Sequence, residues 1–369
     1  MYKDGPFSAI GFYKILIIKT SSLGDIIQSF PVLPYLHRRF SNVVIDWVVE
    51  ESFASIVRAH PLIRKAIPVN MKQLKKHWFG FGPWRRLFQS IHALRQETYH
   101  IVFDLQGNCK SGAMTFCAKG NTKVGLSLSS VREWPNILAT QVRFKIPQQI
   151  NIRQQHLQLL QRFFKDDRDI DTPGVCLTLL PSEQGQFRSI LQVRALQSSC
   201  KIMVCPGSKW VNKQLPIATL CSLLGKMHQE LQATFLLVWG GEEEKRDCEE
   251  IQRQFPTKSY LAEPLSLPLW QNLMHAVDLI FAVDSSALHL CGTTATPSFS
   301  VFGPTDAIVF KPLGPRHFAY QGKCPYGRTF AKTCPVLRSC ATGACIRNLA
   351  ADAIYDAFIV WWRSRSVDK

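Results

Sequence analysis

The sequence predicts an α/β protein with two successive doubly wound, parallel-sheet domains. Short apolar, β-branched runs alternate along the chain with stretches of helical spacing, which is the order expected of βαβ units. Polar or glycine-containing turns follow these apolar runs. The alternation starts a second time near residue 175, and 369 residues are enough for two domains of roughly 100–200 residues each.

The first half of the chain opens with a βα unit. Residues 13–18 form an apolar strand, residues 19–25 a polar turn, and helical spacing continues through Leu36. Further strands are expected at 43–49, 65–69 and 100–105. Parallel strands of this kind are usually covered by helices on both faces.

The second half repeats this order after a charged connection at 166–174. Strands are expected at 201–204, 233–239, 279–283 and 297–302, and helices at 215–230, 269–277 and 350–362. We place an N-terminal domain at 1–175, a C-terminal domain at 176–348 and a terminal helical segment at 349–369. Two such domains suggest a ligand cleft beyond the carboxyl ends of the strands.

Composition and charge narrow the classes of function. Hydrophobic residues make up 46% of the chain, which is enough to build cores and argues against intrinsic disorder. The net charge of +17 points to an anionic partner: a nucleic acid, a phosphorylated small molecule or an acidic membrane surface. The 12 cysteines are mostly scattered in apolar runs, which is typical of reduced thiols in a cytosolic protein. We find no apolar run of about 20 residues that would span a bilayer.

Asp25 follows the first strand, within a turn that also contains Lys19, Thr20, Ser21 and Gly24. It can be a helix N-cap, because aspartate favours the positive end of a helix. It can also be a general base, since a carboxylate at a strand end can accept the proton of an attacking hydroxyl. Both interpretations stay open from the residues alone.

The second half carries candidate residues for an anionic ligand. Asp284, Ser285 and Ser286 lie at a strand-to-helix turn, which can hold a phosphate or simply cap the helix. His289 lies one turn further on and is more often a packed core residue. Lys209 and Lys213 follow another strand and can neutralise a diphosphate or remain solvated.

Three acids, residues 242–244, follow a strand and two glycines. One of them can bind ribose hydroxyls, as acids after nucleotide-binding strands do. The alternative is a solvated acidic helix start.

Residues 61–100 contain eight lysines and arginines against one acid, with aromatic residues among them at 78–84. This combination fits a nucleic-acid groove, but no DNA- or RNA-binding motif accompanies it. A phosphorylated, acidic lipid headgroup satisfies the same electrostatics. Cys324, Cys334, Cys340 and Cys345 lack the close CxxC pairs of zinc sites, so we expect no metal.

Several motifs, in order, resemble the lipopolysaccharide heptosyltransferases of glycosyltransferase family 9, most of all type I. They are ILIIKTSSLGD (15–25), DWVVEESF (46–53), the basic segment 72–79, FDLQGNCKSG (103–112), VWGGEEE (238–244), VDSSALHL (283–290) and VFGPTD (301–306). The family commonly has Asp-Thr-Gly where this chain has Asp284-Ser285-Ser286.

The resemblance implies a GT-B fold, with two Rossmann-like domains facing across a cleft and the C-terminal helix packing back on the N-terminal domain. It implies an inverting, metal-independent transfer of heptose from ADP-heptose to the Kdo region of lipid A, without a cofactor. The enzyme would work at the cytosolic face of the inner membrane, in peripheral contact with its anionic surface, and would bind no nucleic acid.

Carried onto this chain, the resemblance makes Asp25 the general base and assigns two groups of binding residues. The donor-binding group is Lys209, Lys213, Glu242 or Glu244, Asp284, Ser285, Ser286 and His289. The acceptor-binding group is Lys72, Lys75, Lys76 and Arg132. A type II heptosyltransferase or another nucleotide-sugar transferase is the alternative within the class. A basic nucleic-acid-binding protein is the non-enzyme alternative. A Rossmann oxidoreductase would also have this kind of fold, but the GxGxxG motif expected after its first strand is missing.

Overall fold

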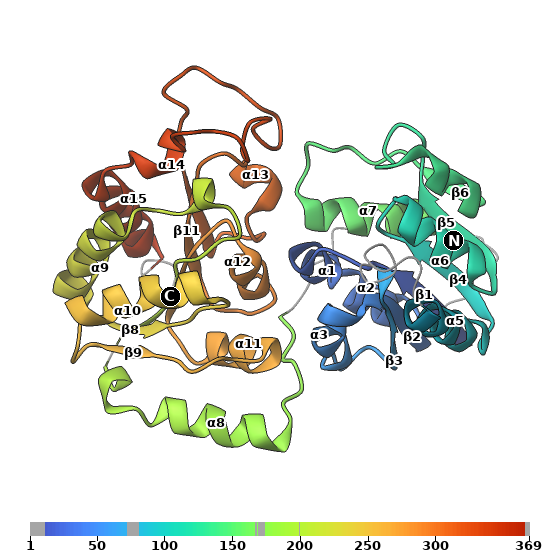
Figure 1. The fold of residues 1–369 in the computed structure, drawn as a ribbon, viewed down its shortest axis with the longest axis horizontal. Coiled ribbons are helices and arrows are strands. Elements are labelled where there is room, and N and C mark those ends of the chain that lie inside the picture. The colour runs from blue at the N-terminus through green and yellow to red at the C-terminus, as the bar shows by residue number, and fades with distance from the viewer. Residues whose placement is uncertain (1–11, 72–80, 167, 169–173, 199, 366–369) are drawn as a thin grey trace. The chain divides into compact units, whose positions relative to one another are not determined.

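The computed structural model describes residues 12–71, 81–166, 168, 174–198 and 200–365 and divides into two compact units, Met1–Pro173 and Gly174–Lys369 (Figure 1). Each unit contains one six-stranded sheet. All the strand pairs within the two sheets are parallel.

The N-terminal sheet has the strand order β3-β2-β1-β4-β5-β6. Its strands are β1 (Phe12–Ile18), β2 (Asn42–Glu50), β3 (Lys65–Val69), β4 (Tyr99–Asp104), β5 (Gly120–Leu126) and β6 (Val142–Phe144). The described α-helices are α1 (Leu23–Ser29), α2 (Val32–Arg39), α3 (Ala54–Arg58), α5 (Phe81–Arg95), α6 (Cys109–Cys117) and α7 (Ile152–Phe164). The middle of the sheet is in register at Ile15, which lies opposite Ile45 on one side and Ile101 on the other.

The C-terminal sheet has the order β12-β11-β10-β7-β8-β9. Its strands are β7 (Lys201–Cys205), β8 (Thr234–Leu237), β9 (Ser259–Leu261), β10 (Leu279–Val283), β11 (Ser298–Phe302) and β12 (His317–Gln321). The helices are α8 (Pro181–Leu191), α9 (Ile217–Leu231), α10 (Glu242–Gln254), α11 (Leu267–His275), α12 (Ser286–Cys291), α13 (Ala307–Phe310), α14 (Ala344–Arg347) and α15 (Ala351–Ser364). Short 3-10 turns complete both units, including η2 (Trp134–Ala139) and η4 (Val211–Lys213).

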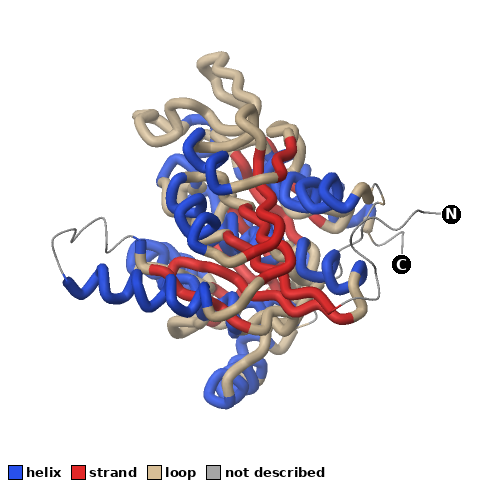
Figure 2. Tube along the Cα trace, turned by 90° about the vertical axis from the view of Figure 1, so that its right-hand side faces the viewer, coloured by secondary structure: helices blue, strands red, loops and turns tan. Residues whose placement is uncertain are grey.

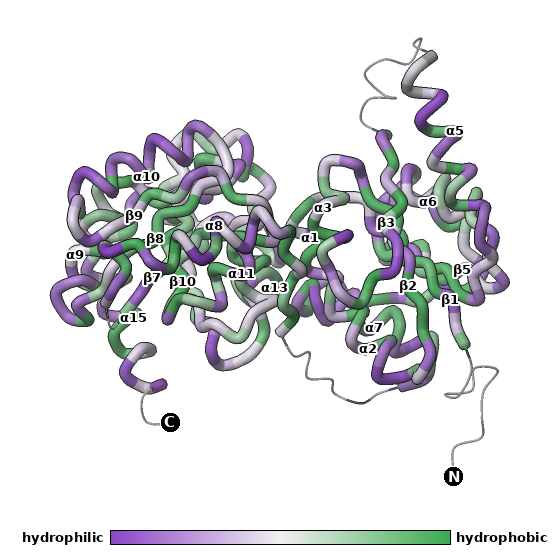
Figure 3. Tube along the Cα trace, turned by 90° about the horizontal axis from the view of Figure 1, so that it is seen from below, coloured by the Kyte–Doolittle hydropathy of each residue, from purple (hydrophilic) through white to green (hydrophobic). Residues whose placement is uncertain are grey.

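Apolar burial explains why these runs form strands. All five residues of β10 are buried, and residues 15–18 of β1 are fully buried, as expected for strands with helices on both faces. Figure 2 shows the helices, in blue, lying outside the strands, in red. Outer helices are polar on their free side, and α10 is mostly hydrophilic in Figure 3.

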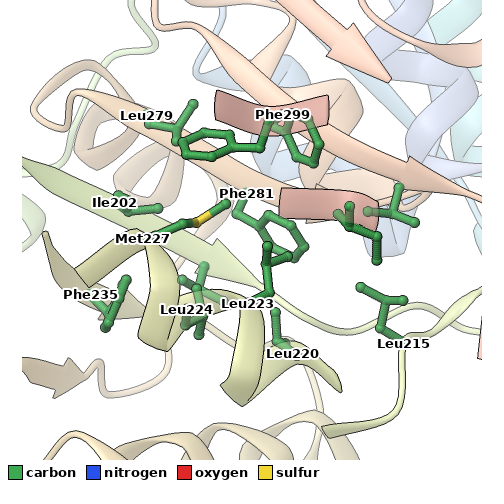
Figure 4. Close-up of a cluster of buried hydrophobic side chains, with 14 of the residues drawn as sticks. Ile202, Leu215, Leu220, Leu223, Leu224, Met227, Phe235, Leu279, Phe281 and Phe299 are labelled. Atoms are coloured by element: carbon green, nitrogen blue, oxygen red, sulfur yellow. The ribbon is translucent and has the colours of Figure 1, made fainter. Parts of the chain in front are cut away.

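Aromatic side chains from three neighbouring strands form the centre of the C-terminal core (Figure 4). The ring of Phe299 stacks on Phe318, with centroids 5.4 Å apart, and lies 6.3 Å from the ring of Phe281. Leu223 and Met227 of α9 cover the Phe281 side of this cluster. Truncating a buried phenylalanine to alanine typically lowers the free energy of unfolding by about 3–5 kcal/mol. We therefore expect this cluster to stabilise the C-terminal sheet.

The C-terminal helix α15 has its described contacts within the C-terminal unit. The expectation that residues 349–369 pack back on the N-terminal domain stays a prediction. In the structure, α15 contacts α9 and β12 of the C-terminal unit. Ile354, Phe358 and Trp361 recur at helical spacing on its apolar face and are buried in the C-terminal core, with Phe358 5.3 Å from Phe299.

Among the described residues, no helix combines the length and the apolar character needed to cross a membrane.

Candidate active-site residues at the ends of the two sheets

The first group of candidate residues, here called the N-terminal half-site, comprises the turn between β1 and α1 together with Gln106. The side-chain oxygen of Gln106 accepts hydrogen bonds from the backbone N–H groups of Thr20 (3.1 Å) and Ser21 (3.2 Å). The Lys19 ammonium donates to the carbonyl oxygen of Leu105 at 3.2 Å. Because β1 and β4 are neighbours in the sheet, these bonds fix the turn to the end of β4.

Asp25 is half-buried in the first turn of α1. Its Oδ2 atom accepts hydrogen bonds from the backbone N–H of Ser22 (3.1 Å) and from the Ser22 hydroxyl (3.0 Å). Ser22 is the N-cap of α1, so Asp25 is not the N-cap itself but the third helical residue of a capping box. Both of the hydrogen bonds from Ser22 end on Oδ2, so among the described residues Oδ1 has no hydrogen-bond donor and can accept a proton. The geometry is therefore compatible with capping and with general-base chemistry at once.

The charge of Asp25 is set by opposing influences. Burial raises its pKa, but the positive charge of Lys19, the two hydrogen bonds from Ser22 and the neighbouring His156 outweigh it and hold the pKa below its usual value. Asp25 is therefore an ionised carboxylate at neutral pH.

Arg132 lies near the same edge of the sheet. The carbonyl oxygen of Gly107, directly after Gln106, accepts hydrogen bonds from the backbone N–H groups of Arg132 (2.9 Å) and Glu133 (3.0 Å). Gly107 has a φ of +69°, a conformation that favours glycine. The Arg132 side chain is exposed.

The buried carboxylate of Asp104 fixes the turn at Gln106 and Gly107 through hydrogen bonds. Asp104 Oδ1 accepts from the backbone N–H groups of Gln106 and Gly107, and Oδ2 accepts from Thr115 and Asn136. Lys72, Lys75 and Lys76, the other residues assigned to the acceptor, lie outside the residues that the structure describes.

The second group, here called the C-terminal half-site, is centred on Asp284 at the end of β10. Asp284 Oδ2 accepts from the Lys213 ammonium at 2.5 Å and from the Thr305 hydroxyl at 2.6 Å. Lys213 follows β7 and Thr305 follows β11, and these two strands flank β10 in the sheet. Three neighbouring strands therefore bring a lysine, an aspartate and a threonine together.

Asp284 remains charged although it is buried. Burial raises its pKa, but Lys213, His289 and the hydrogen bonds from Lys213 and Thr305 outweigh that effect and keep the pKa below its usual value. His289 Nε2 lies 3.8 Å from Asp284 Oδ1. His289 is buried on α12, yet it faces the site rather than only the core.

Ser285 and Ser286 open α12 beside Asp284. The Ser285 hydroxyl is buried and has no hydrogen-bond partner among the described residues, so its polar capacity is unused there. The neighbouring Ser208 hydroxyl donates to the Asp284 carbonyl oxygen at 3.1 Å, which ties the turn after β7 to the turn after β10.

The structure separates the two acids assigned to the ribose. Glu244 turns back toward the sheet, where its Oε2 accepts the Gly240 N–H at 2.7 Å. It also packs on Gly207, at which a Cβ atom would overlap the Glu244 carboxyl group. Glu242 is exposed at the start of α10. Lys209 is also exposed, with its ammonium 5.6 Å from the Trp210 ring.

Three residues that complete these half-sites were not assigned from the sequence: Gln106, Thr305 and Asp104. Each lies within a motif that the sequence analysis quoted, but their roles depend on contacts between distant residues, such as the 86-residue separation between Thr20 and Gln106. Their position at the end of a strand or within three residues of it was the one available signal.

Among the residues that the structure describes, no group of three or more His, Cys, Asp or Glu side chains is arranged to hold a metal ion. The expectation that the reaction needs neither metal nor cofactor stays a prediction.

Comparison with known proteins identifies the family. The family model of glycosyltransferase family 9 (heptosyltransferase) matches residues 85–339, which is more than half of the chain. The chain belongs to this glycosyltransferase family. The type 1 lipopolysaccharide heptosyltransferase of Pseudomonas aeruginosa is 28% identical over 324 residues, covering 87% of each chain. The type 1 enzyme of Escherichia coli K12 is 26% identical over 300 residues, covering 79% of this chain and 88% of the relative.

Solved structures agree on the fold. Escherichia coli heptosyltransferase WaaC with ADP superposes with a TM-score of 0.73 at 23% identity, covering 94% of this chain and 99% of that one. Escherichia coli heptosyltransferase II gives a TM-score of 0.69 at 17% identity, covering 96% of this chain and 99% of that one. The predicted α/β class with two Rossmann-like domains of the GT-B kind is confirmed for this family 9 member.

Proposed function

We propose that this family 9 glycosyltransferase is a type 1 heptosyltransferase, which transfers heptose from ADP-heptose to the Kdo region of lipid A with inversion. The relatives named type 1 are 24–28% identical to the chain, against 20% and 22% for relatives named type 3 and type 2. A neighbouring structure with the same TM-score of 0.73 contains ADP-2-deoxy-2-fluoro heptose. The observation that carries the proposal is that the two half-sites differ in chemistry: one offers an available carboxylate and the other a positioned lysine.

Asp25 is the general base of the proposed reaction. An acceptor hydroxyl oxygen attacks the anomeric carbon, its proton passes to Asp25 Oδ1, and the bond from the anomeric carbon to the diphosphate oxygen breaks. The hydrogen bonds from Ser22 to Oδ2 fix the carboxylate while Oδ1 remains available. Positioned bases of this kind typically contribute about 10²–10⁴ in rate.

Lys213 stabilises the departing diphosphate of ADP. Its ammonium has three donors, and the hydrogen bond to Asp284 uses one of them. Asp284 bears the same sign of charge as a diphosphate, so its proposed role is to hold Lys213 and His289 rather than to contact the phosphates. The unused Ser285 hydroxyl and the Ser286 backbone are the further donors on this side.

The remaining donor residues have graded roles. Glu244 is the better candidate for the ribose, because its carboxylate lies against the sheet edge beside Gly207 and Gly240. Glu242 and Lys209 are exposed and have minor roles at most in this proposal. Arg132, with Lys72, Lys75 and Lys76, would bind the acidic groups of the acceptor.

Peripheral contact with an anionic membrane at the cytosolic face fits the charge of the N-terminal unit. Helix α5 contains three arginines and no acid, and Figure 3 shows it extending from the unit. Its Trp84 and Phe88 rings lie 6.4 Å apart, and Phe88 is 64% exposed. Aromatic and cationic residues together favour the interface of an acidic bilayer.

The proposed function is tested by incubating the full chain with ADP-heptose and Kdo-lipid A and measuring the product mass. We expect the addition of one heptose. A product formed only from an acceptor that already carries heptose would favour the type 2 activity instead, and no transfer to either acceptor would refute the proposal.

A further inference from the structure

A loop rich in cysteine contacts two turns of the C-terminal half-site. We call residues 322–345, which run from the end of β12 into the first turn of α14, the cysteine loop. Its four cysteines, Cys324, Cys334, Cys340 and Cys345, line one small cavity together with Asn212. All four are free thiols. Burial, with the three neighbouring thiols, raises the pKa of Cys345 to about 11, so it is protonated at neutral pH.

Asn212 connects this loop to the lysine of the half-site. Its side-chain N–H group donates to the carbonyl oxygens of Leu337 (2.9 Å) and Cys340 (2.8 Å). Gly343, with a φ of +58°, lies so close that a Cβ there would be 2.5 Å from Asn212 Oδ1. Asn212 is the residue directly before Lys213. A displacement of the loop at Cys340 would therefore move Asn212 and, through the peptide bond, the backbone of Lys213.

A second connection runs to Thr305. The Cys334 N–H donates to the Pro304 carbonyl oxygen at 2.7 Å, and the Asp306 N–H donates to the Lys332 carbonyl oxygen at 3.0 Å. These bonds bracket Thr305, whose hydroxyl donates to Asp284. The cysteine loop therefore contacts both turns that hold the Lys213–Asp284 pair.

Cys340 has the geometry of a reactive thiol in this cluster. Its sulfur accepts a hydrogen bond from the Gly343 N–H at 3.4 Å and lies 3.8 Å from the Thr342 hydroxyl oxygen. Arg328 lines the same cavity. Hydrogen bonds from the Gly343 and Thr342 backbones and from the Thr342 side chain, with the charge of Arg328, lower the pKa of Cys340. The thiol is half-buried and so can meet a small reagent.

We propose that Cys340 is a modification site for low-molecular-weight disulfides, and that its modification weakens nucleotide binding at Lys213 through Asn212. The Cys340 thiolate attacks one sulfur of the disulfide, that S–S bond breaks, and the other half leaves as a thiolate. The product is a mixed disulfide on Cys340, with no other oxidant needed. The cavity, at about 30 Å³, is too small for the added group, so the modification displaces the loop and the carbonyl oxygens that Asn212 binds. The coupling rests on the proposed function, because it assumes that Lys213 binds the diphosphate of ADP.

The test uses the full chain with Cys109 and Cys176, the two exposed thiols outside the loop, changed to serine. A chromogenic aromatic disulfide is the probe, peptide mass locates the adduct, and calorimetry measures the Kd for ADP. We expect one adduct on Cys340 and an ADP affinity about tenfold weaker, as for the loss of two buried hydrogen bonds. A reducing agent should restore the affinity, and Cys340→Ser should resist both effects.

A positioning role for Asn212 is separated from a structural one by a second variant. Asn212→Ala should weaken ADP binding to a similar degree without any reagent, and modification should then weaken it no further. An unreactive Cys340, release of a metal ion on reaction, or an adduct that leaves the Kd unchanged would each overturn the inference. Failure of the unmodified chain to bind ADP would overturn the proposed function itself, and with it the coupling.

Discussion

The two half-sites each contain an aspartate directly after a strand or in the first turn of the following helix, but the two carboxylates have different surroundings. Asp25 is half-buried and accepts hydrogen bonds from neutral donors of its own helix start, all on one oxygen. Asp284 is 3% exposed and binds a lysine and a threonine from two neighbouring strands. One carboxylate keeps an oxygen available, and the other is committed to holding a cation.

This comparison shows that position alone does not decide the role of an aspartate at a strand end. Both pKa values lie below their usual range, so the charge state does not distinguish the two residues either. The partners distinguish them. A carboxylate with a free oxygen can accept a proton, whereas one paired with a lysine orients that lysine for an anionic ligand.

The largest expected effect separates the two aspartates directly. Asp25→Asn keeps a polar side chain at the helix start but removes the base, and we expect turnover to fall by about 10²–10⁴. Turnover is measured by product mass under saturating donor and acceptor. A variant with more than a tenth of the parent rate would exclude Asp25 as the base.

The next effect tests the cation of the C-terminal half-site. Lys213→Ala should weaken ADP binding by about two orders of magnitude, because it removes a charged hydrogen bond to the diphosphate and leaves Asp284 buried without its partner. The matched control is Lys209→Ala, four positions earlier and exposed, which should change the Kd less than threefold. Equal losses in the two variants would contradict the assignment of Lys213.

Thermal unfolding of Lys213→Ala is the necessary companion measurement. A buried carboxylate without its partner typically destabilises a protein by about 3–5 kcal/mol. The ADP titration is therefore carried out at a temperature at which the variant is folded.

A smaller effect is expected at Thr305, which the sequence did not single out. Thr305→Val keeps the shape of the side chain and removes the hydroxyl that donates to Asp284. We expect ADP affinity to fall about three- to tenfold, in line with one lost hydrogen bond to a charged group. Turnover at saturating donor should be preserved, and a loss of turnover at unchanged affinity would contradict a role in positioning the cation.

The smallest effect is a change in acid stability. The pKa of Asp284 is lower in the folded state than in the unfolded chain, so its contribution to stability is present above the unfolded value of about 4 and is lost as the pH falls through the folded value. Urea unfolding between pH 5 and the acid transition should therefore show a flatter pH dependence for Asp284→Asn than for the parent. Parallel curves would mean that Asp284 does not titrate as described.

The central strands and the candidate aspartates could be predicted from the sequence because they depend on local patterns. The run at 279–283 coincides with β10, and the polar residues after it lie at the sheet edge as expected. The edge strand β6 was missed because it has three residues and none of them is buried. The partners Gln106 and Thr305 were not assigned, because their contacts join segments that are distant in sequence.

The terminal helix illustrates the same limit. Its apolar spacing predicts a helix with one buried face, and that face is present in α15. The pattern does not say which domain covers the face. The structure places Phe358 and Trp361 in the C-terminal core, beside strands whose own aromatic residues complete the contact.

Equilibrium binding of ADP to Asp25→Asn tests most directly whether one half-site supplies the general base and the other binds the nucleotide. The account predicts a Kd within about twofold of the parent, because it assigns the diphosphate to Lys213 and only the acceptor hydroxyl to Asp25. A Kd raised tenfold or more in the folded variant would show that this aspartate binds the nucleotide, and would contradict the division between base and cation.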